Sequence, residues 1–123
     1  NVYIISGGYK PALNILADFL SIPPNKVFGV ELDFDNQGNY IGFDQNQVLI
    51  TNSGKKELIS KMPIDLSQTA MIGDGANDLE VQSIVDLFIG FRGTRDNEFM
   101  RQNCQIFVDS NNLLQVLKII EQN

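Results

Sequence analysis

The sequence predicts an α/β fold, a Rossmann-like parallel sheet with flanking helices, together with a β-hairpin around residues 27–44. Three observations favour this class. Short apolar runs alternate along the chain with segments of helical periodicity, which is typical of parallel strands joined by helical crossovers. Two of the runs end in glycine-rich polar turns, at residues 6–8 and 73–75, where open α/β sheets place their ligands. No internal repeat or low-complexity segment interrupts the alternation.

The chain opens with a predicted strand and an amphipathic helix. The apolar run at residues 2–6 predicts the strand, and apolar residues recur at helical spacing over residues 11–20. Four of them share one helical face and are expected in the core: Leu13, Leu16, Ala17 and Leu20. Two consecutive prolines then end the helix.

A hairpin is predicted next. Residues 27–34 and 40–43 form two extended runs around a turn at residues 36–39. In the first run apolar residues alternate with Glu31 and Asp33, which indicates that one face of the hairpin is exposed to solvent.

The second half of the chain alternates more regularly. A helix is expected at residues 55–62, ending before a proline, and a strand at residues 69–72. The remaining elements are a helix at 78–84, a strand at 87–91, a helix at 95–102, a strand at 106–108 and a closing helix at 111–120. Arg92, Arg95 and Arg101 follow the strand at 87–91; either one of them contacts a substrate or all are solvated helix residues.

Composition limits the possible functions. A chain of 123 residues fits a single domain with a real core. Nine basic against fifteen acidic residues give a net charge of −6, which disfavours non-specific nucleic-acid binding. With no histidine and one cysteine, the chain has no Ser-His or Cys-His pair, histidine metal site or internal disulfide. No transmembrane or signal-peptide pattern is present, so a cytoplasmic enzyme domain is expected.

The most informative segment is GDGAND at residues 73–78, which follows an apolar strand. Glycines on both sides of Asp74 let the backbone turn sharply and approach a ligand. Asp78 enters the first turn of the next helix, where the dipole favours a carboxylate. The pattern indicates a metal and phosphate pocket; an ordinary capped strand-to-helix turn is the alternative.

Two more polar segments carry chemistry. Ser6, with the amides of Gly7 and Gly8, predicts an anion cradle ahead of the first helix. Lys55 and Lys56 stand at the start of another helix, where the dipole disfavours a cation, so one of them is expected to serve another charge. The Gly-Gly turn lacks the glycine spacing of Rossmann and P-loop nucleotide sites.

A hydroxyl, a lysine and Asp-Gly-x-Asn-Asp, in this order, carry a family resemblance. Together with residues 2–8, 38–44 and 89–91, they make the chain similar to the haloacid-dehalogenase-like (HAD) phosphohydrolases, and to the phosphoserine phosphatases among them most closely. The resemblance covers nearly the whole chain. It implies one HAD-like core domain over residues 1–123 and a small phosphomonoester as substrate, with no nucleic acid or membrane partner.

The resemblance also implies roles for individual residues. Asp74 would be a ligand of Mg²⁺, a hard cation that keeps much of its hydration shell. Lys55, with Lys56 as the alternative, would pair with the phosphate and with the nucleophile's carboxylate. Asp78 would orient Lys55, or would only stabilise the helix start, and both interpretations stay open.

Four residues would hold the phosphate group by the same resemblance. Ser6 and the Gly7 amide would bind its oxygens, with Gly8 completing the cradle, and Asn77 would donate an amide hydrogen bond. In the family an aspartate attacks phosphorus, an aspartyl-phosphate forms, and water releases phosphate.

The chain departs from the family pattern in one respect. The family's first motif, Asp-x-Asp-x-Thr or Val, precedes the serine and carries the nucleophile, and here only five residues precede Ser6. Asp33-Phe34-Asp35 has similar letters but follows the serine and runs into the hairpin turn. The expectation is therefore the C-terminal portion of a magnesium-dependent phosphoserine phosphatase of serine biosynthesis, inactive as the isolated chain and without a cap. The alternative is a non-catalytic HAD-like module that binds phosphate or metal.

The missing motif has a structural implication. In the family its strand lies between the strands expected here at residues 2–6 and 69–72. Unpaired strand edges are rarely left bare. We therefore expect a partner chain in the gap, an exchange of elements within a dimer, or direct pairing of these two strands.

Overall fold

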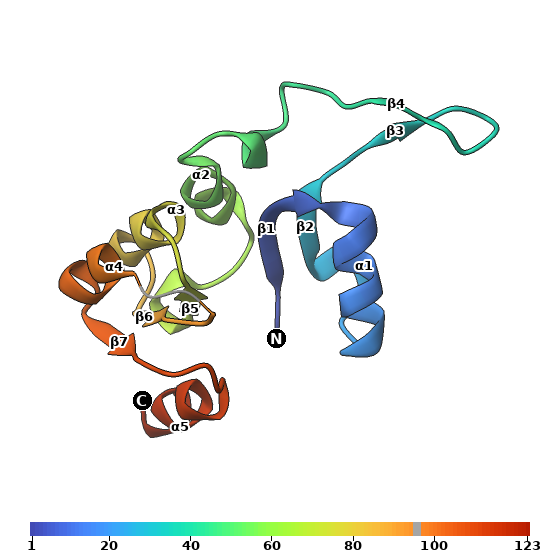
Figure 1. The fold of residues 1–123 in the computed structure, drawn as a ribbon. Helices are drawn as coiled ribbons and strands as arrows, with labels where there is room; N and C mark the ends of the chain where they lie inside the picture. The colour runs from blue at the N-terminus through green and yellow to red at the C-terminus, as the bar shows by residue number, and fades with distance from the viewer. Residues whose placement is uncertain (95–96) are drawn as a thin grey trace. The chain divides into compact units, whose positions relative to one another are not determined.

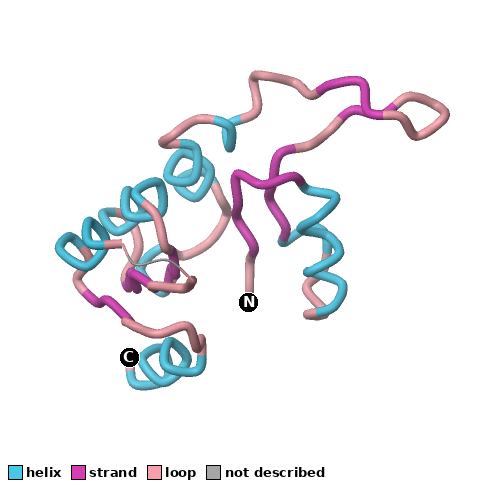
Figure 2. The backbone as a smooth tube through the Cα atoms, viewed as in Figure 1, coloured by secondary structure: helices cyan, strands magenta, loops and turns pink. Residues whose placement is uncertain are grey.

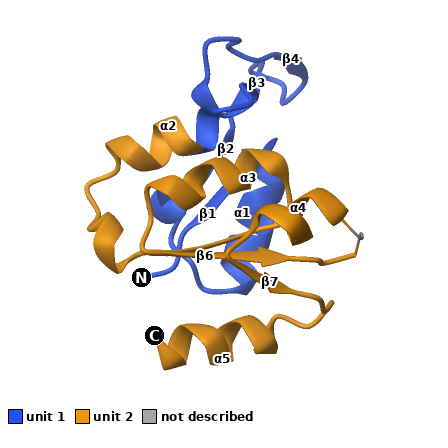
Figure 3. Ribbon diagram, turned by 90° about the vertical axis from the view of Figure 1, so that its left-hand side faces the viewer, with its two compact units in different colours: residues 1–55 blue, residues 56–123 orange. Residues whose placement is uncertain are grey.

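The computed structural model describes residues 1–94 and 97–123 and confirms the predicted α/β class. Strands and helices alternate along the chain, and most strands pair in parallel (Figure 1). The chain divides into two compact units, residues 1–55 and 56–123 (Figure 3). That residues 1–123 form a single domain stays a prediction.

The first unit begins with β1 (Ile4–Tyr9), α1 (Lys10–Phe19) and β2 (Val27–Val30). The two strands pair in parallel, and α1 packs against both. The predicted strand extends further than expected, to Tyr9, but its pairing with β2 is irregular between Ile5 and Tyr9. A strand with such an irregularity can contain Gly7 and Gly8 without a continuous ladder of backbone hydrogen bonds.

Helix α1 approaches β2 closely at Gly29, where a Cβ would lie 2.5 Å from Leu13 Cδ1. Ala17 is buried on the same helix. Leu16 and Leu20 are 48% and 51% exposed, so their predicted core position is wrong in this structure. The helix packs by a narrow stripe, and its remaining apolar residues face outward.

The predicted hairpin is present as β3 (Asp33–Phe34) and β4 (Tyr40–Gly42), an antiparallel pair. It extends away from β1, β2 and α1 (Figure 2). Asp35 holds its turn, because its Oδ1 accepts hydrogen bonds from the amides of Asn39 and Gln37, at 2.8 and 2.9 Å. These bonds, that of Asn39 first, lower the pKa of the Asp35 carboxyl.

The extended run at residues 27–34 is interrupted between β2 and β3. The Gln47 side chain bonds both backbone groups of Glu31, accepting from its N–H at 2.7 Å and donating to its carbonyl at 2.9 Å. A side chain thus takes the place of a neighbouring strand, and the run divides at this point. Two 3₁₀ turns complete the unit, at Pro24–Lys26 and Val48–Ile50.

The second unit contains a parallel sheet in the order β5 (Ala70–Gly73), β6 (Leu87–Phe91) and β7 (Ile106–Val108). Helix α5 (Leu114–Gln122) covers one face, where Val116 packs with the buried Ile89 and Val108. The other elements are α2 (Gly54–Lys61), α3 (Ala76–Leu79), α4 (Glu98–Asn103), and 3₁₀ turns at Leu66–Gln68 and Glu80–Ser83. The first two residues of α2 belong to the first unit.

Helix α4 lies on the opposite face of β6 from α5. A Cβ on Gly90 would come within 2.4 Å of Cys104 Sγ, at the end of α4, whereas its neighbour Ile89 points to α5. The Cys104 side chain thus packs against Gly90, and its burial raises the pKa of the thiol. The predicted helix at 95–102 is found from Glu98 onward; residues 95 and 96 lie outside the described residues.

The predicted helix at residues 78–84 differs in type. It begins as the short α3 and continues as a 3₁₀ turn that buries Val81 completely.

Among the described residues, none of the helices is long and apolar enough to cross a membrane.

In the part of the chain that the structure describes, β1 pairs with β2 in the first unit and β5 pairs with β6 in the second. What lies in the gap expected between the strands near residues 2–6 and 69–72 (a partner chain, an exchanged element or direct pairing) stays a prediction. Each strand takes its partner from its own unit, and β5 is an edge strand of its sheet.

Candidate active site

The turn between β5 and α3 is built around the carboxylate of Asp78. This side chain is 4% exposed. Its Oδ2 accepts hydrogen bonds from the backbone amides of Asp74 and Gly75, at 3.0 and 3.1 Å. A buried carboxylate that accepts from the N–H groups at a helix start satisfies donors that the helix leaves open. The turn therefore has a fixed backbone whose shape depends on one side chain.

Two glycines of the turn differ in what they permit. A Cβ on Gly73 would lie 2.2 Å from Asp78 Cβ, so no larger residue fits there without moving the turn. A Cβ on Gly75 would meet no atom closer than Asp78 Oδ2, at 3.8 Å. Gly73 thus makes room for the Asp78 side chain, whereas its predicted role, letting the backbone approach a ligand, stays a prediction.

The side chain of Asp74 is exposed at the carboxyl end of β5. Its backbone is held on both sides: the amide donates to Asp78 Oδ2, and the carbonyl accepts from Asn97 Nδ2 at 3.1 Å. Asn77 is also exposed, on the first turn of α3. The turn therefore presents one carboxylate and one amide from a rigid backbone.

The Asp74 carboxylate could supply only one of the several ligands that a hard cation such as Mg²⁺ needs. Carboxylate oxygen is the donor type that Mg²⁺ prefers, and the ion usually keeps several waters and takes one or two carboxylates. Within residues 1–94 and 97–123, no group of three or more histidine, cysteine, aspartate or glutamate side chains could hold a metal ion. Asp74 alone would thus supply one ligand from the described chain.

Ser6, Gly7 and Gly8 lie in the irregular second half of β1, in the first unit. The Gly8 amide donates to Ser6 Oγ at 3.0 Å. The predicted cradle therefore has the Gly8 amide turned toward the serine and not outward. Because the Ser6 oxygen already accepts this bond, its hydroxyl hydrogen can serve as a donor to an anion. Gly7 and Gly8 are exposed, and Ser6 is half-buried.

Lys55 and Lys56 occupy the first turn of α2, as predicted, and both are half-buried. Gly54 begins this helix and is itself buried. A Cβ there would lie 1.9 Å from the carbonyl oxygen of Val48, so the helix start packs directly on backbone. This glycine thus lets α2 begin directly against the preceding 3₁₀ turn.

The structure thus brings together the predicted residues in two sets. Asp74, Asn77 and Asp78 share one turn of the second unit, and Ser6, Gly7, Gly8 and Lys55 belong to the first. That the two sets form a single site stays a prediction. Asn97 was not predicted, although an asparagine followed by glutamate at the start of a helix is a recognisable capping signal.

Two of the arginines are engaged in ion pairs within the second unit. Arg101 Nη1 lies 2.9 Å from Asp109 Oδ2, and Arg92 Nη1 lies 3.3 Å from Asp109 Oδ1. Arg101 also stacks on the Phe107 ring, 4.9 Å from its centroid. Its hydrogen bond lowers the pKa of Asp109. Arg92 thus joins the carboxyl ends of β6 and β7 through Asp109, and Arg101 connects α4 to the same carboxylate. Arg95 lies outside the described residues.

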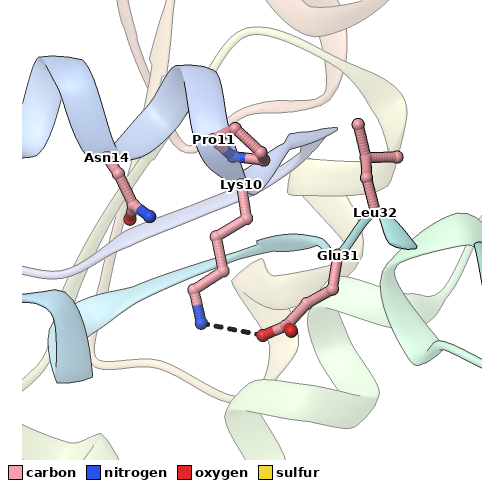
Figure 4. Close-up of a pocket in the computed structure, with 5 residues that line it drawn as sticks. All are labelled: Lys10, Pro11, Asn14, Glu31 and Leu32. Atoms are coloured by element: carbon pink, nitrogen blue, oxygen red, sulfur yellow. Dashed lines mark hydrogen bonds and ion pairs between the residues drawn. The ribbon is translucent and has the colours of Figure 1, made fainter. Parts of the chain in front are cut away.

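A separate hollow lies in the first unit beside the start of α1 (Figure 4). It is open, with a volume of about 230 Å³. Its lining residues are Lys10, Pro11, Asn14, Glu31 and Leu32. Lys10 Nζ and Glu31 Oε1 are 2.9 Å apart, so the two charges of this hollow neutralise each other. None of the predicted site residues lines it.

Comparison with known proteins identifies relatives, although no family model matches the chain. The chain is 38% identical to the chloroplastic phosphoserine phosphatase of Arabidopsis thaliana over 107 residues, which cover 84% of this chain and 36% of that protein. It is 35% identical to the phosphoserine phosphatase of Homo sapiens over 109 residues, which cover 87% of this chain and 48% of that protein. The chain thus spans half or less of the length of these relatives.

Solved structures show the same relationship. A substrate-bound phosphoserine phosphatase superposes with a TM-score of 0.76 at 26% identity, over 96% of this chain and 55% of that one. A probable phosphoserine phosphatase from Vibrio cholerae, at 22% identity, shares the fold with a TM-score of 0.78, over 98% of this chain and 36% of that one. By its sequence and its fold, the chain is similar to part of the phosphoserine phosphatases, which are haloacid-dehalogenase-like proteins.

Proposed function

We propose that the chain is the phosphate- and metal-binding part of a magnesium-dependent phosphomonoesterase that converts O-phosphoserine to L-serine and phosphate in cytoplasmic serine biosynthesis. One observation carries the proposal: the buried Asp78 carboxylate fixes the turn after β5, so that Asp74 and Asn77 project from a rigid backbone. The names of the relatives supply the substrate class. The partner is thus a small phosphomonoester and not a nucleic acid or a membrane.

Each residue then has a defined task. Asp74 would hold Mg²⁺, which supplies charge neutralisation for the phosphoryl group when bound. Asn77 would donate an amide hydrogen bond to a phosphate oxygen, and Ser6 would donate its hydroxyl hydrogen to another. Lys55 would pair its ammonium group with the phosphate, and Asp78 would orient that lysine while holding the turn.

The phosphate cradle would be completed by backbone. The Gly7 amide would donate to the phosphate group, while the Gly8 amide keeps Ser6 Oγ in place through its 3.0 Å hydrogen bond. Phosphoryl transfer depends mostly on positioning and electrostatic stabilisation. These residues would provide both without supplying the atom that attacks phosphorus.

The nucleophile is proposed to come from outside residues 1–123. Asp33 and Asp35, the only Asp-x-Asp pair ahead of residue 60, lie in the hairpin, and Asp35 is used to hold the turn. The isolated chain would therefore be inert. A segment bearing Asp-x-Asp-x-Thr or Val, or a second copy in a strand-exchanged dimer, would be needed to complete the sheet beside β5.

The test combines turnover and metal binding. We expect the isolated chain to release no phosphate from O-phosphoserine with Mg²⁺, and to gain activity when mixed with such a segment. Asp74→Asn should weaken Mn²⁺ binding, followed by electron paramagnetic resonance, by about tenfold or more, while Asp33→Asn leaves it unchanged. Turnover by the isolated chain would mean that the nucleophile lies within it. Equal Mn²⁺ affinity for wild type and Asp74→Asn would remove Asp74 from the metal site.

A non-catalytic binding module is the second candidate. It is favoured by the metal-ligand count, since the described residues contain no cluster of three ligands. Such a module would bind inorganic phosphate, yet would show no turnover even when the complementing segment is added. Phosphate titration of the chain, with and without that segment, separates the two candidates.

A further inference from the structure

We propose that Asn97 clamps the turn after β5 to the start of α4 and thereby acts as a positioning residue for Asp74. The clamp consists of two hydrogen bonds made by the Asn97 side chain. Its consequence for metal binding rests on the proposed function of Asp74. Asn97 would not touch the substrate or the cation.

Asn97 makes two hydrogen bonds of opposite polarity. Its Nδ2 donates to the carbonyl oxygen of Asp74 at 3.1 Å, and its Oδ1 accepts from the amide of Met100 at 3.2 Å. A carbonyl can only accept and an amide N–H can only donate, so the two partners together define how the Asn97 amide group is oriented. One side chain thus connects two segments of the chain.

The bond to Asp74 completes a two-sided restraint. The peptide group before Asp74 is held by Asp78 Oδ2, and the peptide group after it is held by Asn97 Nδ2. With both flanking peptide planes fixed, the direction of the Cα–Cβ bond of Asp74 is fixed as well. The Asp74 carboxylate itself is exposed and can reach a ligand. Preorganising a ligand residue in this way is what outer-shell groups do at metal sites.

A helix cap alone does not explain an asparagine here. Serine, threonine and aspartate accept from the helix amides about as well as asparagine does. Only asparagine, at this length, has both the acceptor for Met100 and the donor for Asp74. The second bond, which spans 23 residues, therefore accounts for the residue type.

The experiment separates the two bonds. Asn97→Ser keeps the cap of α4 but is too short to reach Asp74, and Asn97→Ala removes both bonds. Asn103→Ser changes an asparagine whose side chain donates to the Phe99 carbonyl within α4. Amide hydrogen exchange is measured by NMR on the metal-free full chain, and Mn²⁺ affinity by electron paramagnetic resonance.

For Asn97→Ser we expect the amides of Asp74 and Gly75 to exchange about tenfold faster, because one hydrogen bond to the turn is lost. The α4 amides should stay within about twofold of wild type, since serine is an adequate cap. Mn²⁺ affinity should fall about tenfold, the typical effect of an outer-shell change. Asn97→Ala should speed exchange in both segments, and Asn103→Ser should leave the turn and the affinity unchanged.

Unchanged exchange at Asp74 and Gly75 in Asn97→Ser would overturn the clamp. Equal loosening of the turn and α4 would also overturn it, since that is the behaviour of a cap alone. Faster exchange at the turn with unchanged Mn²⁺ affinity would overturn the positioning role. A wild-type chain that binds no Mn²⁺ would contradict the proposed metal site and that role with it, while the exchange data would still decide the clamp.

Discussion

Two aspartates of the same turn have opposite environments. Asp78 is 4% exposed and accepts two backbone hydrogen bonds, whereas Asp74 is exposed and bonded through its backbone. Burying a carboxylate is tolerated only when hydrogen bonds replace its hydration, and here they do. The turn thus separates the carboxylate that holds its backbone from the carboxylate that is proposed to contact a ligand.

Gly73 offers a direct test of this construction. Gly73→Ala would place a methyl group 2.2 Å from Asp78 Cβ, so we expect a loss of about 2–3 kcal/mol in the free energy of unfolding. Gly75→Ala is the matched control, because its Cβ would have room; the weaker capping of alanine should cost less than about 1 kcal/mol. Urea unfolding measures both. Equal losses would show that Asp78 does not pack as closely as described.

At this scale the sequence indicated the residues of the turn better than it indicated their hydrogen bonds. The GDGAND pattern indicated a sharp turn, because glycine, aspartate and asparagine are the residues that turns and helix starts favour. It could not show that Asp78 accepts from the amide of Asp74, since helix-dipole stabilisation alone explained that carboxylate. Asn97 could not be connected to Asp74, because nothing in a sequence reports a hydrogen bond across 23 residues.

Among the elements, β6 and β7 were predicted with their observed bounds, because each is a short apolar run in a sheet covered on both faces. The run at residues 27–34 was predicted as one extended element but divides at Glu31, where the Gln47 side chain replaces a strand. A glutamine sixteen residues away gives no local signal of this kind. Element type follows from periodicity, and interruption follows from tertiary contacts.

Helix α5 provides a test at the element scale. Val116 is 3% exposed and packs on β6 and β7, whereas its neighbour Leu117 is 48% exposed. We expect Val116→Ala to lower the free energy of unfolding by about 2 kcal/mol through the cavity it leaves. Leu117→Ala should change it by less than about 0.5 kcal/mol. Denaturant unfolding of the two variants compares them, and similar losses would mean that α5 does not cover the sheet with this face.

The ion pairs at the ends of β6 and β7 predict a dependence on pH. The hydrogen bond from Arg101 lowers the pKa of Asp109 in the folded state. The stability this provides is present above the unfolded-state pKa and is lost as pH falls through the lower, folded-state pKa. Asp109→Asn should therefore unfold more easily at pH 7 and lose less stability on acidification than wild type does.

The measurement is a series of urea unfolding curves at pH values from about 7 down to about 3. Arg101→Gln is the companion variant, because it removes the first cause of the shift while keeping the carboxylate. It should flatten the pH dependence in the same way. Curves parallel to that of wild type in both variants would show that this pair adds no pH-dependent stability.

For the molecule as a whole, the edge of β5 is the surface expected to govern self-association. Its hydrogen-bonded neighbour among the described strands is β6, and Ile72 on this strand is 38% exposed. An apolar strand with an open edge is a template for pairing with another chain. We expect the isolated chain to self-associate as its concentration rises, and Ile72→Lys to reduce this association.

Light scattering after size-exclusion chromatography measures the association over a range of concentrations. Ile15→Lys is the control, since Ile15 is 76% exposed but lies on α1, where no strand can pair. If Ile15→Lys alone reduced the association, the self-association surface would lie on α1 and not on β5. A wild-type chain that stays monomeric throughout would show that the edge is protected.

The turn after β5 also has a consequence for how the protein assembles. The two bonds to Asp78 join residues three and four positions apart, whereas the bond from Asn97 closes a loop of 23 residues. Short loops close quickly and at small entropic cost, and long ones must wait for the intervening strand and helix. We expect the carboxylate-bearing turn to take shape early during folding, with its attachment to α4 as one of the last events.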